Sequence, residues 1–532
     1  MIRDLEQSPD STDIEADLCI IGAGMAGLTV ARELMATKRR IVLLETGQLD
    51  RTAIHDALNE TSLDGPHRLD VVTTRPRVLG GGSVAWGSFC TPLDPADFAP
   101  TAGRSLSGWP FGLDILAPYY QRAQQQLELG PPYFDERLWP LFGVTPPAFD
   151  SQRLRTKFWQ FRSPSLFPLV APLRFGKAYR AELAAAPDCT VVLNATVTAL
   201  ARNADGQVES AAFRSLGGRT GRVRAGCFLL AAGAIENARL LLISDIGNQH
   251  DMVGRCFMEH PHVTAARLTT SDAPPLLDTW AIRRRRQGVA LQPSLCPTPQ
   301  LQETEDILNC CLAVEIDRDP ACPTQAVATI GEALRSRHAI PEPMRNIGRI
   351  VSDPGTFWRN AYRRVVHGSG VLPRVRSIQL YCRSEQEPNP DSRIKLDRER
   401  DALGMPRVRL AWTLTERDRR TVAVFTRVVA DELARLGLAR ATMEPWLAEA
   451  TGWPTDLRGG PHHSGTTRMA DDPRQGVVDR DGLVHGLTNL YVTGASTFPT
   501  GGYVNPGLTV VALALRTADH LRDRLPGLLQ RH

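Results

Sequence analysis

Continuous apolar runs and helical periodicity mark the first elements that the chain predicts. Residues 17–21 (DLCII) and 40–45 (RIVLLE) are typical of strands buried on both faces, and the residues before Leu34 have the period of a helix. A strand, helix and strand in this order form a unit of a parallel sheet. Residues 222–231 predict another buried strand, which passes through Gly233 into a helix over 235–242, so this arrangement occurs twice.

Shorter elements fill the rest of the chain. We expect helices over 118–129 and 177–187, and strands over 190–193, 207–213 and 490–493. The last strand precedes a loop rich in Pro and Gly, and then a strongly apolar helix that runs to about residue 521.

Between about 265 and 455 the pattern changes to one typical of antiparallel strands. Residues 392–397 and 408–414 flank a turn, and an amphipathic helix follows over about 416–436. This part of the chain therefore predicts a sheet with a helix covering one face.

Charge and composition narrow the function classes. The 532 residues include 62 Lys and Arg against 58 Asp and Glu, a formal net charge of +4, which does not indicate a nucleic-acid or membrane-surface protein. No apolar run is long enough for a membrane span, and the polar N-terminus lacks the apolar core of a signal peptide. The ten cysteines have no CxxC spacing, so we expect reduced thiols in a cytoplasmic protein and no metal site. The arginine run at 283–286 is more typical of a solvated loop than of a grip on an anionic partner.

The most specific local motif is the segment GAGMAG at 22–27, which follows the first strand and opens the first helix. It matches GxGxxG, in which glycines let the backbone approach a pyrophosphate and the helix N-terminus supplies free N–H groups. Glu45 ends the second strand, where a carboxylate accepts hydrogen bonds from ribose hydroxyls. Together they predict NAD or FAD rather than NADP, against the alternative of a tight turn without a ligand.

Nearly the whole chain resembles one family, the glucose-methanol-choline (GMC) flavoprotein oxidoreductases. The resemblance rests on GAGMAG with Glu45, Arg77 with LGGGSVAWG (79–87), AAGAIENARLLL (231–242), GRCFMEHP (254–261), EQEPNPDSRIKLD (385–397), HHSGTTRM (462–469) and NLYVTGASTFPTGGYVNPGLT (489–509). Such blocks in one order are highly specific. The C-terminal blocks are most similar in form to the branch that contains pyranose 2-oxidase and the fructose dehydrogenase large subunit.

The resemblance implies FAD as the cofactor and an α/β fold of two domains, each built from separate segments. A Rossmann-like FAD-binding domain of the GR2 type would take residues 14–98, 188–264 and 456–532. A substrate domain with an antiparallel β-sheet covered by helices would take residues 99–187 and 265–455.

The resemblance also places two catalytic residues. In the family a histidine and a second polar residue face the flavin ring, and these positions fall on His462 and Asn505. A neutral imidazole suits the base that removes the O–H proton of an alcohol while the C–H leaves as hydride to flavin N5. Asn505, which both donates and accepts, can hold the same hydroxyl. His463 competes with His462 for the role, either can be a structural residue of the turn, and His260 and His262 are expected to be structural.

Further cofactor contacts are expected along the matching blocks. Pro506 fits the first turn of the last helix, whose N-terminus can stabilise negative charge near the flavin N1. Ser83 and Trp86 are expected near the reactive face of the flavin, with a purely structural glycine loop as the alternative. The full expected set is Gly22, Gly24, Gly27, Glu45, Gly81, Gly82, Ser83, Trp86, Val197, Gly233, Gly494, Ala495, Asn505 and Pro506. Pyranose oxidase attaches its flavin through a histidine where this chain has Ala85, so we expect non-covalent FAD.

These features predict FAD-dependent oxidation of a CH–OH group in a sugar, polyol or glycoside-like alcohol, with His462 as general base. The alternatives are a tailoring oxidase that acts on a bulky natural product, a non-redox lyase on the same fold, and a non-enzymatic flavin-binding protein. The electron acceptor can be oxygen, a quinone or a protein, and the sequence does not choose among them. It also leaves homo-oligomerisation open, and fold alone does not fix a substrate.

Overall fold

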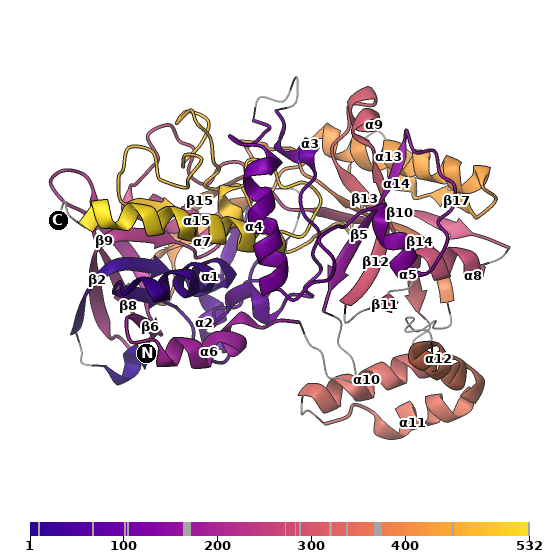
Figure 1. Ribbon diagram of the computed structural model, residues 1–532, viewed down its shortest axis with the longest axis horizontal. Helices are drawn as coiled ribbons and strands as arrows, with labels where there is room; N and C mark the ends of the chain where they lie inside the picture. Colours follow the sequence, from indigo (N-terminus) through magenta and orange to yellow (C-terminus); the bar gives the residue numbers. More distant parts are fainter. Residues whose placement is uncertain are drawn as a thin grey trace.

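Two large sheets lie side by side along the long axis of the molecule, each with its own helices (Figure 1). The computed structural model describes residues 1–529 apart from 9–10, 66, 68, 101–102, 104–105, 163–171, 272, 282–283, 287–288, 319–321, 337–338, 367–374 and 449–451. Buried apolar side chains form one large cluster around the first sheet and another around the second. The hydrophobic core therefore has two main parts, one around each large sheet.

The first sheet contains the parallel strands that the apolar runs predict. Its order is β1-β6-β3-β2-β9-β8-β7, with β19 beside β9, and only β7 and β8 run antiparallel to their neighbours. The strands are β1 (Ile2–Asp4), β2 (Ser11–Ile21), β3 (Ile41–Leu44), β6 (Cys189–Leu193), β7 (Thr196–Arg202), β8 (Val208–Arg214), β9 (Thr220–Leu230) and β19 (Leu490–Val492). The expected Rossmann-like class is confirmed, and the carboxyl ends of its parallel strands meet at one edge.

The main helices of this half are α1 (Met25–Leu34), α4 (Leu113–Gln126), α6 (Phe175–Ala185), α7 (Ala234–Ser244) and α15 (Gly507–Leu529). Two of them correct the sequence prediction. α4 begins at Leu113 rather than 118, so Pro118 lies inside the helix and removes only one backbone donor. α15 continues past 521 to Leu529, because Leu521, Leu525 and Leu528 keep a buried face on an otherwise polar stretch.

The second sheet is antiparallel, as expected. Its order is β11-β12-β13-β14-β10-β17, with β5 beside β12 and β18 beside β10. The strands are β5 (Leu154–Phe161), β10 (Pro261–Thr269), β11 (Arg284–Arg286), β12 (Val289–Pro297), β13 (Cys310–Arg318), β14 (Val375–Ser384), β17 (Arg440–Met443) and β18 (Arg458–Gly459). Helix α13 (Glu416–Arg435) packs on β10, β13, β14 and β17, so the predicted helix covers the sheet.

Two features of this half depart from the prediction. The pair β15 (Arg393–Arg400) and β16 (Pro406–Ala411) is antiparallel but joins β4 (Thr61–Leu63) in a separate three-stranded sheet, because β16 pairs with β4 rather than with the large sheet. In addition, the region expected to be strands contains three helices, α10 (Pro323–Ser336), α11 (Pro343–Ser352) and α12 (Pro354–Val366), which pack against one another. They form a group below β11 and β12 in Figure 1.

The remaining helices of four to six residues are α2 (Ala53–Asp56), α3 (Pro95–Phe98), α5 (Trp139–Phe142), α8 (Ala273–Leu276), α9 (Pro299–Thr304) and α14 (Pro445–Ala448). Among the described residues, no helix combines the length and the apolar composition that a bilayer crossing needs. All ten cysteines are buried free thiols. Of the arginine run, Arg283 lies outside the described residues, and the other three form β11.

Candidate active site

A cavity lies at the carboxyl edge of the parallel sheet, where open α/β sheets bind their ligands. Residues at the ends of β2, β3, β9 and β19 line it, together with the start of α1 and of α7. Most of the residues expected to bind the cofactor are among its lining: Gly22, Gly24, Glu45, Gly81, Gly82, Val197, Gly233, Gly494, Ala495 and Pro506. His462 and His463 line the same cavity. Residues from both ends of the chain thus face one space.

The three glycines of the GxGxxG turn have different structural roles. Gly22 has a φ of +104°, and a Cβ there would lie 2.7 Å from Ala232 Cα. A Cβ on Gly27 would lie 2.0 Å from the carbonyl oxygen of Gly22, so this glycine permits close packing of α1 on the turn. By contrast, a Cβ on Gly24 would meet nothing within 4 Å. Gly24 is therefore the glycine that leaves room for a ligand at the N-terminus of α1.

Glu45 is held by the backbone at the end of β3. Its Oε2 accepts from Ala23 N at 2.9 Å and its Oε1 from Gly47 N at 2.9 Å. Burial raises the pKa of Glu45, whereas these two bonds and the charge of Arg77 oppose the shift. Each oxygen keeps a second lone pair, so the carboxylate remains able to accept from a ribose hydroxyl.

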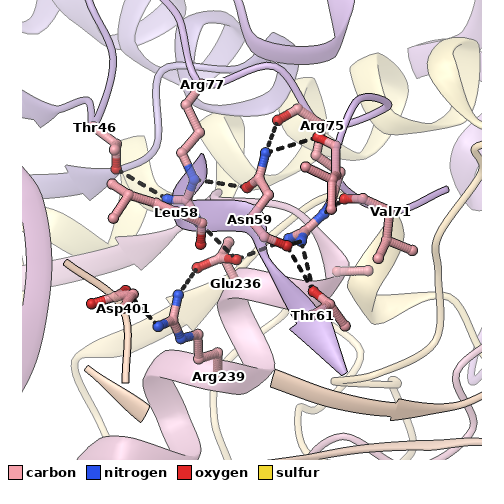
Figure 2. A network of polar contacts seen from close by, with 12 residues as sticks. Thr46, Leu58, Asn59, Thr61, Val71, Arg75, Arg77, Glu236, Arg239 and Asp401 are labelled. Carbon is pink, nitrogen blue, oxygen red and sulfur yellow. Dashed lines mark hydrogen bonds and ion pairs between the residues drawn. The ribbon is translucent and has the colours of Figure 1, made fainter. Parts of the chain in front are cut away.

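A largely buried network of arginines and acids (Figure 2) includes three residues of the cavity lining, namely Arg75, Arg77 and Glu236. Glu236, in the first turn of α7, lies 2.8 Å from Arg75, 2.9 Å from Arg77 and 3.3 Å from Arg239. Arg239 also pairs with Asp401 at 2.7 Å. Although burial acts in the other direction, the charges of Arg77, Arg239 and Arg75 hold the pKa of Glu236 far below its usual range. The sequence pattern drew attention only to Arg77, because nothing local shows that these side chains meet.

His462 is fixed by a buried carboxylate. Its backbone N–H donates to both oxygens of Glu259, at 2.8 and 3.0 Å, and Glu259 also accepts from the backbone of Gly460 and His260. Burial raises the pKa of Glu259 to about 7 against these backbone bonds. Sequence reasoning missed Glu259, whose only signal is a charged residue inside the block GRCFMEHP. The carboxylate thus ties the histidine loop to the residues just before β10.

The ring of His462 contacts a second histidine. His462 Nδ1 lies 3.0 Å from His260 Nδ1; His260 is buried, and His462 is half-buried at the wall of the cavity. Burial lowers the pKa of His260 to about 4, while hydrogen bonds to the backbone of Gly501 and Gly502 act in the opposite direction. The pKa of His462 lies well below its usual range, because of burial and then because of its neighbours His260, His262, His463 and Arg383. Both imidazoles are therefore neutral near pH 7.

The contact between the two Nδ1 atoms requires one of them to donate and the other to accept. His260 Nε2 lies beside the backbone of Gly501, where a Cβ would be 3.4 Å away, and a proton on that nitrogen would make His260 Nδ1 the acceptor. His462 Nδ1 then carries the proton that joins the two rings. This leaves a lone pair on His462 Nε2. His260, expected to be merely structural, therefore touches the candidate base.

His463 also faces the cavity but is oriented differently. Its Nε2 lies 3.4 Å from Glu259 Oε2, and its ring packs at 5.6 Å from the ring of Phe257. Burial lowers its pKa to about 3, and the charge of Arg75 adds to this. One ring nitrogen of His463 is thus directed to a carboxylate, whereas His462 keeps a free one.

Four residues expected at the site have other surroundings. Asn505 is half-buried just before Pro506 and, within the described chain, is absent from the cavity lining. Ser83 Oγ donates to Gly80 O and accepts from Phe175 N, while Trp86 Nε1 donates to Leu173 O. Gly27 serves packing, as described above. The roles of these residues toward a cofactor stay predictions.

Comparison with known proteins agrees with this geometry. Residues 388–514 match a family model described as GMC oxidoreductase. The chain is 23% identical to the fructose dehydrogenase large subunit of Gluconobacter japonicus, over 96% of this chain and 98% of that protein. It is 26% identical to the 6'''-hydroxyparomomycin C oxidase of Streptomyces lividus, over 97% of this chain and 93% of that protein. Among solved structures, a variant of the formate oxidase of Aspergillus oryzae matches 97% of this chain and 99% of its own with a TM-score of 0.57 at 17% identity, a likeness of fold.

The fold and the cavity are those of a dinucleotide-binding α/β protein. The chain resembles the GMC oxidoreductases: residues 388–514 match their family model, and relatives at 23 and 26% identity align with nearly its whole length. FAD is the cofactor that this resemblance implies. The open space at Gly24 and the backbone-held carboxylate of Glu45 fit the pyrophosphate and ribose of that cofactor.

Proposed function

We propose that this enzyme oxidises a CH–OH group of a sugar, polyol or glycoside-like alcohol, with His462 as the base that takes the hydroxyl proton. FAD supplies the hydride acceptor when it is bound. The observation that carries the proposal is that His462 lines the same cavity as the Gly22–Gly27 turn and Glu45, although 417 residues of sequence separate it from Glu45.

The surroundings of His462 suit proton abstraction. Its Nδ1 is engaged by His260, so the proton of the alcohol arrives at Nε2, where the neutral ring has a lone pair. Glu259 holds the backbone of the residue and so limits movement of the ring. Asn505 is proposed as the residue that holds the same hydroxyl, because it adjoins Pro506 of the cavity lining. Ala85 offers no attachment atom, so FAD is proposed to bind without a covalent link.

The proposed substrate class rests on the relatives. One is named for fructose, and two others, 6'''-hydroxyparomomycin C oxidase and paromamine 6'-oxidase, are named for amino sugar compounds. These names support a sugar-like alcohol. The two Streptomyces enzymes also favour the second candidate, a tailoring oxidase that acts on a glycosylated natural product.

An anaerobic absorbance screen tests the reaction and its substrate class together. The holoenzyme is mixed with sugars, polyols, amino sugar glycosides, and aliphatic and aryl alcohols, and loss of the visible absorbance of the oxidised flavin is followed. We expect at least one sugar-like alcohol to bleach the flavin. A substrate that is converted without bleaching would instead indicate the lyase.

His462→Ala gives the first specific prediction. The variant should keep its fold and its flavin absorbance, but the rate of flavin reduction should fall by about 10²–10⁴, the usual contribution of a general base. Stopped-flow reduction under anaerobic conditions measures this rate. His463→Ala is the matched control, because it removes the neighbouring imidazole from the same cavity. Loss of reduction in His463→Ala with a normal rate in His462→Ala would assign the base to His463.

A further inference from the structure

Large apolar side chains are exposed on two consecutive helices far along the chain. Met344, Ile347 and Val351 of α11 are 79, 51 and 70% exposed, and Trp358 and Tyr362 of α12 are 69 and 60% exposed. The other large apolar side chains exposed in the described part of the chain are scattered one to an element: Met1, Ile54, Leu63 and Ile115. Scattered exposure is ordinary, but five such residues within nineteen positions indicate an interaction surface. We call these five residues the α11–α12 face.

On these two helices, large apolar side chains are exposed and several polar side chains are buried, which is the reverse of the pattern on an ordinary surface helix. Their buried positions include small polar residues, namely Asn346, Thr356 and Asn360, which are 2, 6 and 4% exposed. Asn346 Nδ2 donates to Pro341 O at 2.7 Å, and Asn360 Nδ2 donates to Thr356 O at 2.9 Å. Polar side chains are thus satisfied inside, while methionine, isoleucine, valine and two aromatic residues point outward. Water alone does not favour this arrangement.

Arginines border the exposed apolar positions. Met344, Ile347 and Val351 follow the i, i+3, i+7 spacing of one helix face, and Trp358 and Tyr362 are one turn apart. The neighbouring positions hold Arg345, Arg349 and Arg359, whose side chains are exposed or half-buried. Arg349 donates to Asn346 Oδ1 and Arg359 to Thr356 Oγ1, which are neutral acceptors, while Arg345 pairs with exposed Glu342.

We propose that the α11–α12 face docks on the surface of a bilayer that contains anionic lipids. Large apolar and aromatic residues beside arginines are what an interfacial helix presents to the boundary between headgroups and acyl chains. Tyr and Trp favour that boundary, because one end of each ring system is polar. The whole-chain charge of +4 hides this local concentration of arginine.

The charges argue against a second copy of the chain as the occupant. In a twofold dimer the same patch meets itself, which would place the arginines of both copies of α11 and α12 in one interface. Such an interface opposes like charges in the zone that it desolvates. Anionic headgroups complement the same residues, so the lipid surface is the favoured occupant.

Flotation of the full-length holoenzyme with lipid vesicles tests the proposal. We expect co-flotation with phosphatidylcholine vesicles that contain phosphatidylglycerol, and much weaker binding to pure phosphatidylcholine. Trp358→Ser with Tyr362→Ser should lower the partition coefficient roughly tenfold or more, because a large apolar side chain contributes at least that factor. Arg345→Gln, Arg349→Gln and Arg359→Gln should each lower it roughly fivefold, and added salt should do the same.

Ile54→Ser with Ile115→Ser is the matched control, since it removes exposed apolar side chains from α2 and α4 and should float like the parent. Flavin absorbance reports that each variant is folded. The proposal is overturned if the parent does not float with anionic vesicles, or if the Trp358 and Tyr362 variant floats equally well. It is also overturned if light scattering shows a dimer that this variant loses. Because binding rather than turnover is measured, the outcome does not depend on the proposed reaction.

Discussion

The two ring nitrogens of His462 have different surroundings, and this difference sets the pH range in which the residue can act. Nδ1 faces His260 at 3.0 Å, and burial, followed by three neighbouring histidines and Arg383, keeps the pKa of the ring well below its usual range. A base works only while it is neutral, so a lowered pKa moves the acid limb of kcat/KM to lower pH. The enzyme should therefore keep its kcat/KM well below pH 6.5, the ordinary pKa of histidine.

His260→Leu tests whether the second imidazole positions the first. The variant removes both the acceptor for His462 Nδ1–H and a neighbour that lowers the pKa of His462. We expect kcat/KM to fall roughly 10- to 100-fold, as for loss of a residue that orients a catalytic group, and the acid limb to move toward higher pH. A pH profile of kcat/KM with the alcohol found in the screen measures both effects.

His260→Gln is the conservative variant, since its side-chain oxygen can accept from the same N–H and should restore part of the rate. A merely structural role would lower the rate of both variants without moving the limb. If the His260→Leu profile overlays that of the parent, the tautomer argument is wrong.

For single residues, the sequence predicted which residue types belong to the site better than it predicted which side chains contact one another. His462 and Glu45 stand in motifs, so their positions follow from the pattern. The partners of His462 do not, because His260 lies 202 residues away and Glu259 lies 203 residues away. Nothing local to either segment shows that a strand of the second sheet begins beside the histidine loop.

Among the elements, α7 is the clearest case of a helix whose first turn forms ion pairs with residues that are distant in the sequence. Glu236 forms ion pairs with Arg75 and Arg77 of the loop before Gly81, and Arg239 forms ion pairs with both Glu236 and Asp401. Glu236→Gln would leave three largely buried guanidinium groups, those of Arg75, Arg77 and Arg239, with Asp401 as the single carboxylate among these partners. Breaking such a buried network should lower the free energy of unfolding by about 3–5 kcal/mol. Urea unfolding at neutral pH measures the change.

Glu182→Gln is the matched control for this prediction. It breaks the pair with Arg32, in which the two side chains are 27 and 45% exposed, and should cost less than about 1 kcal/mol. Equal losses for the two variants would mean that the Glu236 network adds nothing beyond an ordinary surface pair.

Elements of the parallel sheet were predictable because strands buried on both faces have continuous apolar sequences, as in β2, β3 and β9. The helices α11 and α12 were not, because their outward positions carry apolar residues and their inward positions carry Asn and Thr. A periodicity argument assumes that apolar residues face the core. That assumption does not hold on an element that serves an interaction surface.

For the whole molecule, the cavity depends on segments that span most of the chain. Its lining begins at Ile21, passes through Arg77, Val197 and Glu236, and ends at Val510. The two-sheet division was predictable from the resemblance, and the antiparallel class of the second sheet from its pattern. The pairing of β16 with β4 was not, because it joins residues near 61 to residues near 408. Long-range pairing of this kind leaves no local signal.

This construction links cofactor binding to the stability of the whole chain. The proposed FAD site requires residues from all of these segments, so FAD should bind the folded state and not the unfolded one. By mass action, free FAD at one hundred times its Kd should add about 2.7 kcal/mol to the free energy of unfolding. Thermal unfolding of the deflavinated enzyme at increasing FAD concentration measures this as a rising Tm.

FMN is the control ligand, because it lacks the adenosine whose ribose the carboxylate of Glu45 would hold, and it should raise Tm far less. A Tm that is independent of FAD, or equal for FMN and FAD, would contradict a site whose adenosine end is anchored at the carboxyl edge of the parallel sheet.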